Sequence, residues 1–373
     1  RETPGGGYIR MEQGALPAEV LAEAREALAA WKLKDSAWRL VGTVPGSRGA
    51  VLRPVVEIGD TRYVLRRQPP DLTLADARFR HAFMAHLAAA GLPVSSLLPA
   101  ADGHTWALVG DRVYELQTYL DGHPFLSSGA ASSVRLEAAA VMLGQLHQAS
   151  ADFVWEPHTW PEERSTANIA NSYVSLIADA AENDALSSAI RHGLARVAEG
   201  CAARVEQVSA TLQMADTPQL HIHGDYQPHH LAFGEPDVSA IHDFDAARYD
   251  LRLIELAYSL LYFTGLRWDE RDGLTPPLVD DGLDILAAHR YLRAYGSEAP
   301  PAPGEAAQLA DALALVFPIA LSNGATEDLV FADDFESAPD EEDALQRLEW
   351  ADAFWLWLDR SAETLAQAWE SGV

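Results

Sequence analysis

Two short segments decide the fold: LHIHGDYQPHHLAF at residues 220–233 and AIHDFD at residues 240–245. Each contains a short apolar run that ends at acidic residues, Asp225 in the first segment and Asp243 with Asp245 in the second. Short apolar runs bounded by Gly, Pro and Asp are typical of strands. If the strands pair as a hairpin, Asp225 and Asp243 come near one another at the rim of a cleft.

Two neighbouring carboxylates have the chemistry that phosphoryl transfer requires. One carboxylate orients or accepts the proton of the attacking hydroxyl, and the other holds the Mg²⁺ that bridges the phosphates. Two other interpretations stay open at this point. The segment could be a loop with surface acids, or its histidines could join Asp243 in a zinc site. These histidines are His221, His223, His229, His230 and His242.

The sequence pattern on either side of these segments changes near residue 120. Before it, strand-like runs separated by turn signals predict an antiparallel sheet with helices, and after it apolar residues recur mainly at helical spacing. This order predicts an α+β protein with a small sheet lobe and a large helical lobe. Strands are expected at 38–43, 50–57, 62–67, 105–109 and 112–119, and helices at 17–31, 74–90, 131–149, 168–182, 184–214, 251–264, 279–295, 304–321 and 341–371.

Charge is distributed unevenly along the 373 residues. The whole chain carries a net charge of −28: residues 1–120 carry +1 and residues 121–373 carry −29. A strongly acidic lobe argues against a nucleic-acid partner and suits a cationic ligand, although it also suits simple solubility. The single cysteine, Cys201, excludes an intrachain disulfide, so a cytoplasmic location is expected. No run of apolar residues reaches the ~18 needed to span a membrane, so no membrane partner is expected.

A resemblance to a known family follows from these motifs. His223-Gly224-Asp225 and Ile241-His242-Asp243-Phe244-Asp245 resemble the His-Gly-Asp and Ile-Asp-Phe-Asp pair of the aminoglycoside phosphotransferase and choline kinase family. The resemblance covers roughly residues 38 to 262 and includes weaker pieces in the same order. These pieces are Tyr63–Arg67, Gly91–Val94, Tyr119–Gly122, Leu143–His147 and Arg248–Leu251.

The resemblance implies a bilobal protein-kinase-like fold and an ATP-dependent phosphotransferase that acts on an alcohol group. Its lobes would be an N-terminal extension at 1–36, a nucleotide-binding N-lobe at 37–119 and a helical C-lobe at 120–373. Asp225 would be the catalytic carboxylate, with His223 supporting its loop. Asp243 would be the main Mg²⁺ ligand, assisted by Asp245. The nucleotide would be held by Gly46, Ser47, Arg48, Gly49, Arg66, Gln117 and Tyr119.

Three positions depart from the family pattern. His230 stands where the family has an asparagine metal ligand, and imidazole suits softer ions such as Mn²⁺ better than Mg²⁺. Arg66 stands where a phosphate-binding lysine is usual; the chain has only Lys32 and Lys34, both before the sheet. The helix that usually supplies a glutamate partner for that lysine carries basic side chains instead, namely Arg78, Arg80 and His81.

Three functions fit these observations. The leading hypothesis is a kinase of a small, cationic acceptor such as an aminoglycoside-like molecule, an amino sugar or an amino alcohol. A kinase of Ser or Thr in a natural-product peptide keeps the chemistry and changes the acceptor. A pseudokinase that only binds or scaffolds a partner would explain the three departures, but it would not need both Asp225 and Asp243. The sequence leaves the oligomeric state open.

Overall fold

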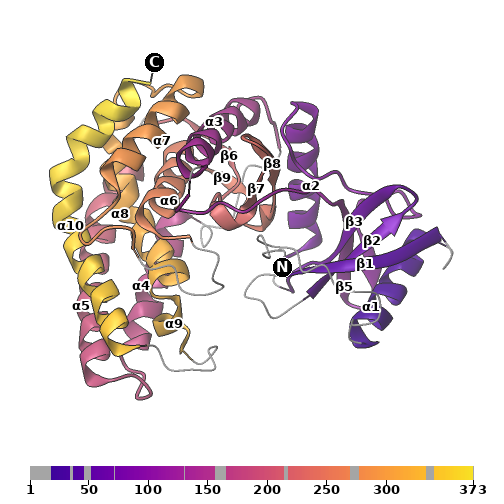
Figure 1. Ribbon diagram of the computed structural model, residues 1–373, viewed down its shortest axis with the longest axis horizontal. Helices are drawn as coiled ribbons and strands as arrows, with labels where there is room; N and C mark the ends of the chain where they lie inside the picture. Colours follow the sequence, from indigo (N-terminus) through magenta and orange to yellow (C-terminus); the bar gives the residue numbers. More distant parts are fainter. Residues whose placement is uncertain are drawn as a thin grey trace. The chain divides into compact units, whose positions relative to one another are not determined.

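The structure is a computed structural model that describes residues 18–33, 37–45, 52–70, 72–129, 131–155, 165–213, 217–268, 277–332 and 340–372. The chain forms two compact units, which Figure 1 shows in the colours of the sequence. The first unit comprises Arg1–Pro124 and Ala232–His242, and the second comprises Phe125–Leu231 and Asp243–Val373. Each unit is described by itself below.

The first unit is built on a five-stranded antiparallel sheet in the order β1-β2-β3-β5-β4. In this sheet Arg66 of β3 lies directly opposite Glu115 of β5. The predicted sheet is therefore present, with β1 running on to Pro45 instead of ending before a turn. The strands are β1 (Trp38–Pro45), β2 (Leu52–Ile58), β3 (Thr61–Arg67), β4 (Ala107–Val109) and β5 (Arg112–Thr118).

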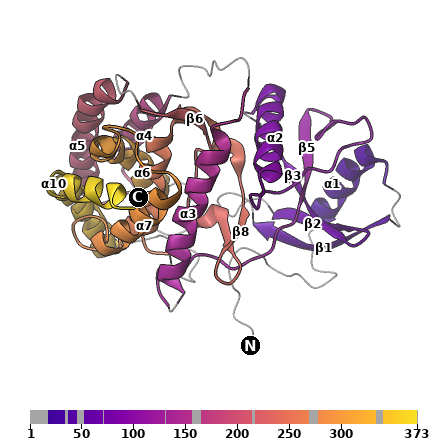
Figure 2. The ribbon, with the colours of Figure 1, turned by 90° about the horizontal axis from the view of Figure 1, so that it is seen from above.

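The two faces of this sheet are covered differently. Helix α1 (Ala18–Leu28) packs on an apolar face that includes Leu65 and Leu116. Side chains alternate between the faces of a strand, so Arg66 and Glu115 point to the other face. Helix α2 (Leu74–Ala89) covers that face; its first turn is closed by a Thr73–Asp76 capping box. Figure 2 shows α1 and α2 on opposite sides of the sheet.

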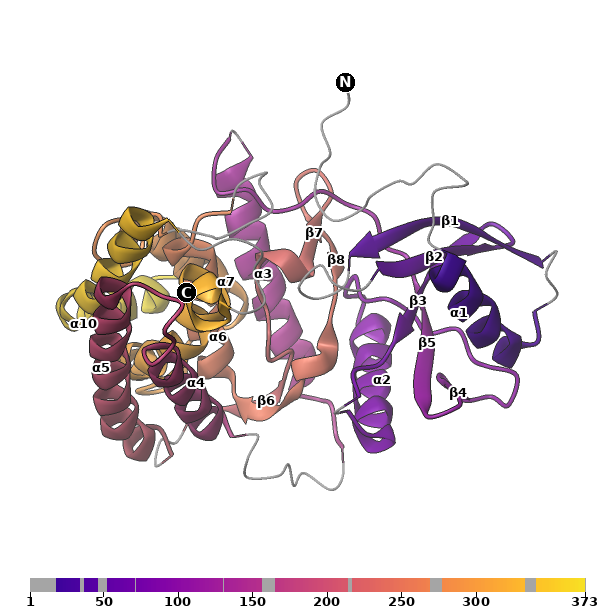
Figure 3. The same ribbon diagram turned by 90° about the horizontal axis from the view of Figure 1, so that it is seen from below.

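A hairpin from the middle of the chain joins the first unit. Strands β7 (Leu231–Phe233) and β8 (Val238–Ile241) pair with each other, and Figure 3 labels both. The backbone N–H and C=O of Phe233 bond those of His123 at 2.8 Å, and the Ile241 N–H donates to the Pro93 carbonyl at 2.8 Å. The sequence analysis had assigned this segment to the helical lobe, whereas its hydrogen bonds connect it to His123 and to Pro93, which follows α2.

The second unit is mostly helical. Its longest helices, α5 and α10, lie side by side in Figure 1, joined by the ion pairs Arg196–Asp352 and Arg204–Asp359 at 2.6 Å. A two-stranded sheet pairs β6 (Gln219–Ile222) with β9 (Arg248–Leu251), a strand that the sequence analysis did not predict. The helices are α3 (Ser132–Ser150), α4 (Thr166–Ala180), α5 (Ser188–Gln213), α6 (Arg252–Gly265), α7 (Ile285–Glu298), α8 (Leu309–Ala320), α9 (Glu327–Val330) and α10 (Glu341–Glu370).

Helix α6 is the centre of the second unit, because every residue from Leu253 to Gly265 is buried. A helix buried on all sides is apolar around its circumference, and polar side chains on it need internal partners. In the described part of the chain, one stretch, Ala306–Ala325, is long and apolar enough to cross a membrane, with a mean hydropathy of 1.4. Of this stretch 72% is buried inside the protein, which is the environment of a core helix.

One of the acidic side chains that follow α8 is buried. The sequence Glu327–Asp343 is rich in acids and reads as a loop, but its start forms α9. Asp328 is 3% exposed and receives two hydrogen bonds from Arg347 of α10, at 2.8 and 3.0 Å. A carboxylate and a guanidinium paired in this bidentate way can be buried together.

Candidate active site

The loop after β6 is shaped by Gly224. This residue has a φ of +83°, and a Cβ added to it would lie 2.0 Å from the carbonyl oxygen of Ala246. Only glycine permits both this backbone conformation and this close approach. The tight turn sets Asp225 at the end of β6, and residues Pro228–His230 follow as a short 3₁₀ helix.

The two carboxylate oxygens of Asp225 have different surroundings. Its Oδ1 accepts hydrogen bonds from the Tyr258 hydroxyl at 2.6 Å and from Gln227 Nε2 at 2.8 Å. Its Oδ2 lies 3.4 Å from Nδ1 of His230. Burial, and then the negative charge of Asp225, raise the pKa of Tyr258 far above its ordinary value, so the phenol remains a donor. Oδ1 is thus held in place, while Oδ2 makes the more distant contact.

Two histidines of this loop, His223 and His230, hydrogen-bond to the backbone of Asp225. Nδ1 of His223 accepts the backbone N–H of Asp225 at 3.2 Å, and His223 is completely buried. Nδ1 of His230 lies 2.8 Å from the carbonyl oxygen of Asp225. A carbonyl only accepts, so this nitrogen of His230 carries the proton. A metal at the predicted His230 position would therefore have to bind through Nε2.

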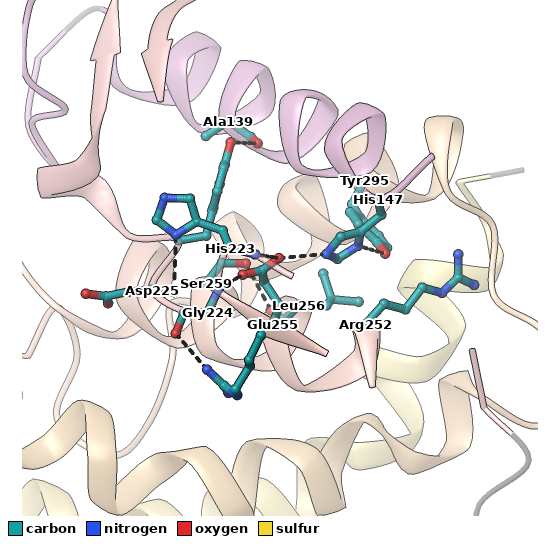
Figure 4. Close-up of polar contacts among 12 residues, drawn as sticks. Ala139, His147, His223, Gly224, Asp225, Arg252, Glu255, Leu256, Ser259 and Tyr295 are labelled. Carbon is teal, nitrogen blue, oxygen red and sulfur yellow. Dashed lines mark hydrogen bonds and ion pairs between the residues drawn. The ribbon is translucent and has the colours of Figure 1, made fainter. Parts of the chain in front are cut away.

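Glu255 of α6 anchors the same loop from below (Figure 4). Its carboxylate accepts the backbone N–H of His223 at 3.1 Å and of Gly224 at 2.5 Å. Nε2 of His147 lies 2.9 Å from Glu255, and Nδ1 of His147 lies 2.7 Å from the Tyr295 hydroxyl. Burial alone raises the pKa of Glu255, but the histidines and the Gly224 N–H outweigh it, so the pKa is lowered.

The sequence analysis missed Glu255 and Tyr258, although a signal for both exists. They lie in the largely apolar helix sequence LRLIELAYSLLYF at 251–263. A charged side chain among residues of a fully apolar helix is buried only with partners, so it marks a contact with another element.

Arg248 connects the two halves of the motif. Its Nη1 donates to the carbonyl oxygens of Gly224 and Ala246, at 3.4 and 3.3 Å. Its other nitrogens donate to Asp250 at 3.0 Å and to Thr166 at 2.9 Å. The guanidinium therefore ties the Asp225 loop to the segment after Asp243.

Asp243 has an unusual backbone. With a φ of 60° it is, beside Lys32, one of two non-glycine residues with positive φ in the described ranges. Such conformations cost energy and cluster at functional sites, and Asp tolerates them better than most residues. Asp243 precedes the short 3₁₀ helix Phe244–Ala246, which carries Asp245. The turn thus presents two half-buried carboxylates close together in sequence.

Among the described residues, a metal site with three protein ligands is not assembled. Within the part of the chain that the structure describes, no three His, Cys, Asp or Glu side chains are grouped to hold a metal ion. The described residues therefore give no support to the alternative in which the histidines and Asp243 bind zinc. Asp243 and Asp245 still fit Mg²⁺ by their chemistry, because this ion takes oxygen ligands and is often held by one or two carboxylates with phosphates and water.

The predicted nucleotide-binding residues fall into three groups. Gly46, Ser47, Arg48 and Gly49 lie outside the described residues. Arg66 and Gln117 meet at Glu115, because Arg66 Nη1 and Gln117 Nε2 both donate to its Oε1, at 3.0 and 2.8 Å. Tyr119 makes different contacts. Its N–H donates to the Arg62 carbonyl at 2.8 Å, and burial together with Asp121 raises the pKa of its phenol to about 12.

Comparisons with known proteins agree with this fold. A homoserine kinase of Paraburkholderia phymatum is 26% identical over 245 residues, which are 65% of this chain and 69% of that protein. The structure of an amicoumacin kinase in complex with AMP-PNP and Ca²⁺ has a TM-score of 0.58 at 11% identity and covers 93% of both chains. That of a microcompartment-associated aminopropanol kinase has a TM-score of 0.54 at 13% identity, covering 93% of this chain and 98% of that one.

These similarities confirm the bilobal, kinase-like α+β fold class that the sequence predicts. The sequence profile described as "Phosphotransferase enzyme family" matches residues 47–309, which is more than half of the chain. The match includes Arg66, Asp225 and Asp243. The chain is a phosphotransferase that belongs to the phosphotransferase enzyme family.

Proposed function

We propose that this protein is an ATP-dependent, cytoplasmic kinase that phosphorylates a hydroxyl group of a small, cationic molecule. The carboxylate of Asp225 is the observation that carries the proposal: one oxygen is fixed by Tyr258 and Gln227, and the carboxylate stays 28% exposed. The similar homoserine and aminopropanol kinases, by their names, also act on small molecules with a hydroxyl group.

Asp225 acts as the proton acceptor in this reaction. The acceptor hydroxyl oxygen attacks the γ-phosphorus of ATP, the bond from that phosphorus to the bridging oxygen breaks, and ADP leaves. The hydroxyl proton passes to Oδ2 of Asp225, since Tyr258 and Gln227 occupy Oδ1. Glu255 and His230 keep the loop that carries this carboxylate in position.

Asp243, with Asp245, would hold the divalent metal. Bound there, Mg²⁺ neutralises negative charge on the phosphates during transfer. His230 could join only through Nε2, and a nitrogen ligand would favour Mn²⁺ over Mg²⁺.

The two units divide the work. The first unit binds the nucleotide through residues 46–49, Arg66, Gln117 and Tyr119, and the second binds the acceptor. A cationic acceptor is supported by the acidic composition of residues after 120.

Titration calorimetry with ATP and GTP, in Mg²⁺ and in Mn²⁺, tests the nucleotide site. The wild-type chain should bind nucleotide in the presence of metal, and Asp243→Ala should lose this binding. Asp359→Asn, which removes a surface carboxylate 53% exposed, is the matched control and should bind as the wild type does. If the wild type binds no nucleotide at millimolar concentration, the kinase hypothesis is excluded, and a pseudokinase that binds or scaffolds a partner becomes the better explanation.

Phosphorus NMR with a panel of acceptors then tests the catalytic role. Asp225→Asn should keep nucleotide binding and lower the rate of phosphate transfer by roughly 10²–10⁴-fold, the contribution of a positioned general base. Amino alcohols and amino sugars should be phosphorylated in preference to neutral alcohols. Transfer only to Ser or Thr peptides would identify the acceptor as a peptide instead.

A further inference from the structure

A buried ionic cluster lies between the sheet of the first unit and α2. At its centre is Glu115, which is completely buried. One oxygen accepts from Arg66 Nη1 at 3.0 Å, and the other accepts from Arg80 Nη2 at 2.7 Å and lies 2.6 Å from His81 Nε2. Both arginines are 2% exposed. Glu115 therefore ties a strand cation to two side chains of the helix.

The same face of the sheet holds a second unusual side chain. Gln68 follows Arg66 by two residues and keeps the strand pairing, since its N–H donates to the Val113 carbonyl at 2.9 Å. Arg66 and Gln68 therefore point to the same face. Gln68 is 5% exposed, and neither its Nε2 nor its Oε1 has a hydrogen-bond partner in the described parts of the chain. Buried amides without partners are rare, and they point to a polar ligand.

In protein kinases, a lysine on the third strand is oriented toward the phosphates by a glutamate on the adjacent helix, and both must be in place for activity. Here the third strand carries Arg66, and the helix side chains that reach into the cluster are Arg80 and His81, neither of them a carboxylate. In the described part of the chain, the carboxylate that bridges Arg66 and Arg80 belongs to strand β5, as Glu115.

We propose that Glu115 is the positioning residue that orients Arg66 toward the nucleotide phosphates, so that the sheet supplies the carboxylate that the helix supplies in protein kinases. This proposal rests on the proposed function, because it assumes that Arg66 binds ATP. Glu115 acts through Arg66, and Gln68 adds an amide donor on the same face.

The chemistry of the cluster suits this role. A guanidinium has five N–H donors in a plane, so a bond to Glu115 and a bond to phosphate are compatible. Burial alone raises the pKa of Glu115, but Arg80, His81 and Arg66 outweigh it and hold the pKa well below its usual value. The carboxylate stays ionised at neutral pH, which fixes Arg66. Because Arg80 and His81 contact the other oxygen of Glu115, this carboxylate also links α2 to Arg66.

Transferring the carboxylate from strand β5 to helix α2 tests the proposal. Calorimetry compares ATP binding by the wild type, Glu115→Gln and the double variant Arg80→Glu/Glu115→Gln, which restores a strand cation with a helix glutamate. Glu115→Gln should weaken ATP binding by about tenfold or more, the loss of one charge-assisted contact. The double variant should recover affinity to within about threefold of the wild type.

The control is Glu305→Gln, which removes a buried carboxylate paired with Arg252 at 2.5 Å in the second unit. It should lower the melting temperature without changing the dissociation constant of ATP. Thermal unfolding of every variant separates lost folding from lost binding, and if Glu115→Gln does not fold, the double variant decides by itself.

Two results overturn the inference alone: folded Glu115→Gln that binds ATP as the wild type does, or a folded double variant without recovery. A wild-type chain that binds no ATP overturns the proposed function, and the inference with it. A loss in Glu115→Gln that reappears equally in Glu305→Gln would mean that the residue is only structural, and it also overturns the inference.

Discussion

Glu115 in the first unit and Glu255 in the second are buried carboxylates in similar surroundings. Each lies within 3 Å of a histidine Nε2, at 2.6 Å for His81 and 2.9 Å for His147. The Nδ1 atom of each histidine contacts a hydroxyl, that of Thr105 at 2.6 Å or that of Tyr295 at 2.7 Å. Both glutamates have lowered pKa values.

Their remaining partners differ, and this difference separates their roles. Glu115 binds the side chains of Arg66 and Arg80, whereas Glu255 binds the backbone N–H groups of His223 and Gly224. Side-chain partners can be exchanged between elements by substitution, but backbone donors stay where the loop puts them. A carboxylate that binds side chains can therefore be relocated by substitution, whereas one that binds backbone donors cannot.

The largest expected effect separates the two glutamates by their kinetics. Glu255→Ala and Glu115→Ala should each lower the free energy of unfolding by about 4 kcal/mol, because each leaves buried partners without a carboxylate. Glu255→Ala should also lower kcat while leaving the KM for ATP unchanged, whereas Glu115→Ala should raise that KM. Urea unfolding and steady-state kinetics measure both. An equal rise in the KM for ATP in both variants would break the comparison.

A smaller effect is expected from the backbone that Glu255 holds. Gly224→Ala should cost about 3 kcal/mol, because strain at positive φ adds to a clash with the Ala246 carbonyl. Gly110→Ala is the matched control: its φ is +63°, but a Cβ there would meet nothing within 4 Å. It should cost about 1 kcal/mol. Urea unfolding measures both, and equal costs would mean that the close approach at Gly224 is relieved by movement of the loop.

The smallest effect concerns acid. For both glutamates burial raises the pKa, and the partners reverse this, so each folded pKa lies below the ordinary value of 4.5, and that of Glu115 lies well below it. Each carboxylate therefore adds stability that is complete above the unfolded pKa and is lost as the pH falls through the folded pKa. The contribution of Glu115 should survive to lower pH than that of Glu255.

Urea unfolding of the wild type, Glu115→Gln and Glu255→Gln between pH 6 and pH 3 measures these two contributions. The stability difference between the wild type and Glu255→Gln should shrink at a higher pH than the difference for Glu115→Gln. The reverse order would show that the arginines around Glu115 stabilise its charge less than the backbone donors stabilise that of Glu255.

The sequence allowed much of this to be predicted, where the signal is local. Strand alternation around Arg66 and helical spacing after residue 131 predicted the elements, since each depends on neighbours along the chain. Contacts between distant elements were missed. The partner of Arg66 was sought on the helix with Arg80, although Glu115 lies 49 residues away along the chain and directly opposite in the sheet. The contact between Arg66 and Glu115 depends on the register of strands β3 and β5, which local sequence patterns do not predict.

The hairpin at 232–242 affects how the protein can be made. The chain leaves the first unit after Pro124, returns at Ala232 and leaves again after His242. During synthesis, His123 therefore cannot form its backbone hydrogen bonds with Phe233 until the ribosome has made the intervening part of the second unit. The first unit is thus complete only after residue 242, when residues 125–231 of the second unit have already been made. A fragment that ends at Pro124 would lack this hairpin, so producing the first unit alone requires residues 232–242 as an added peptide or through a linker.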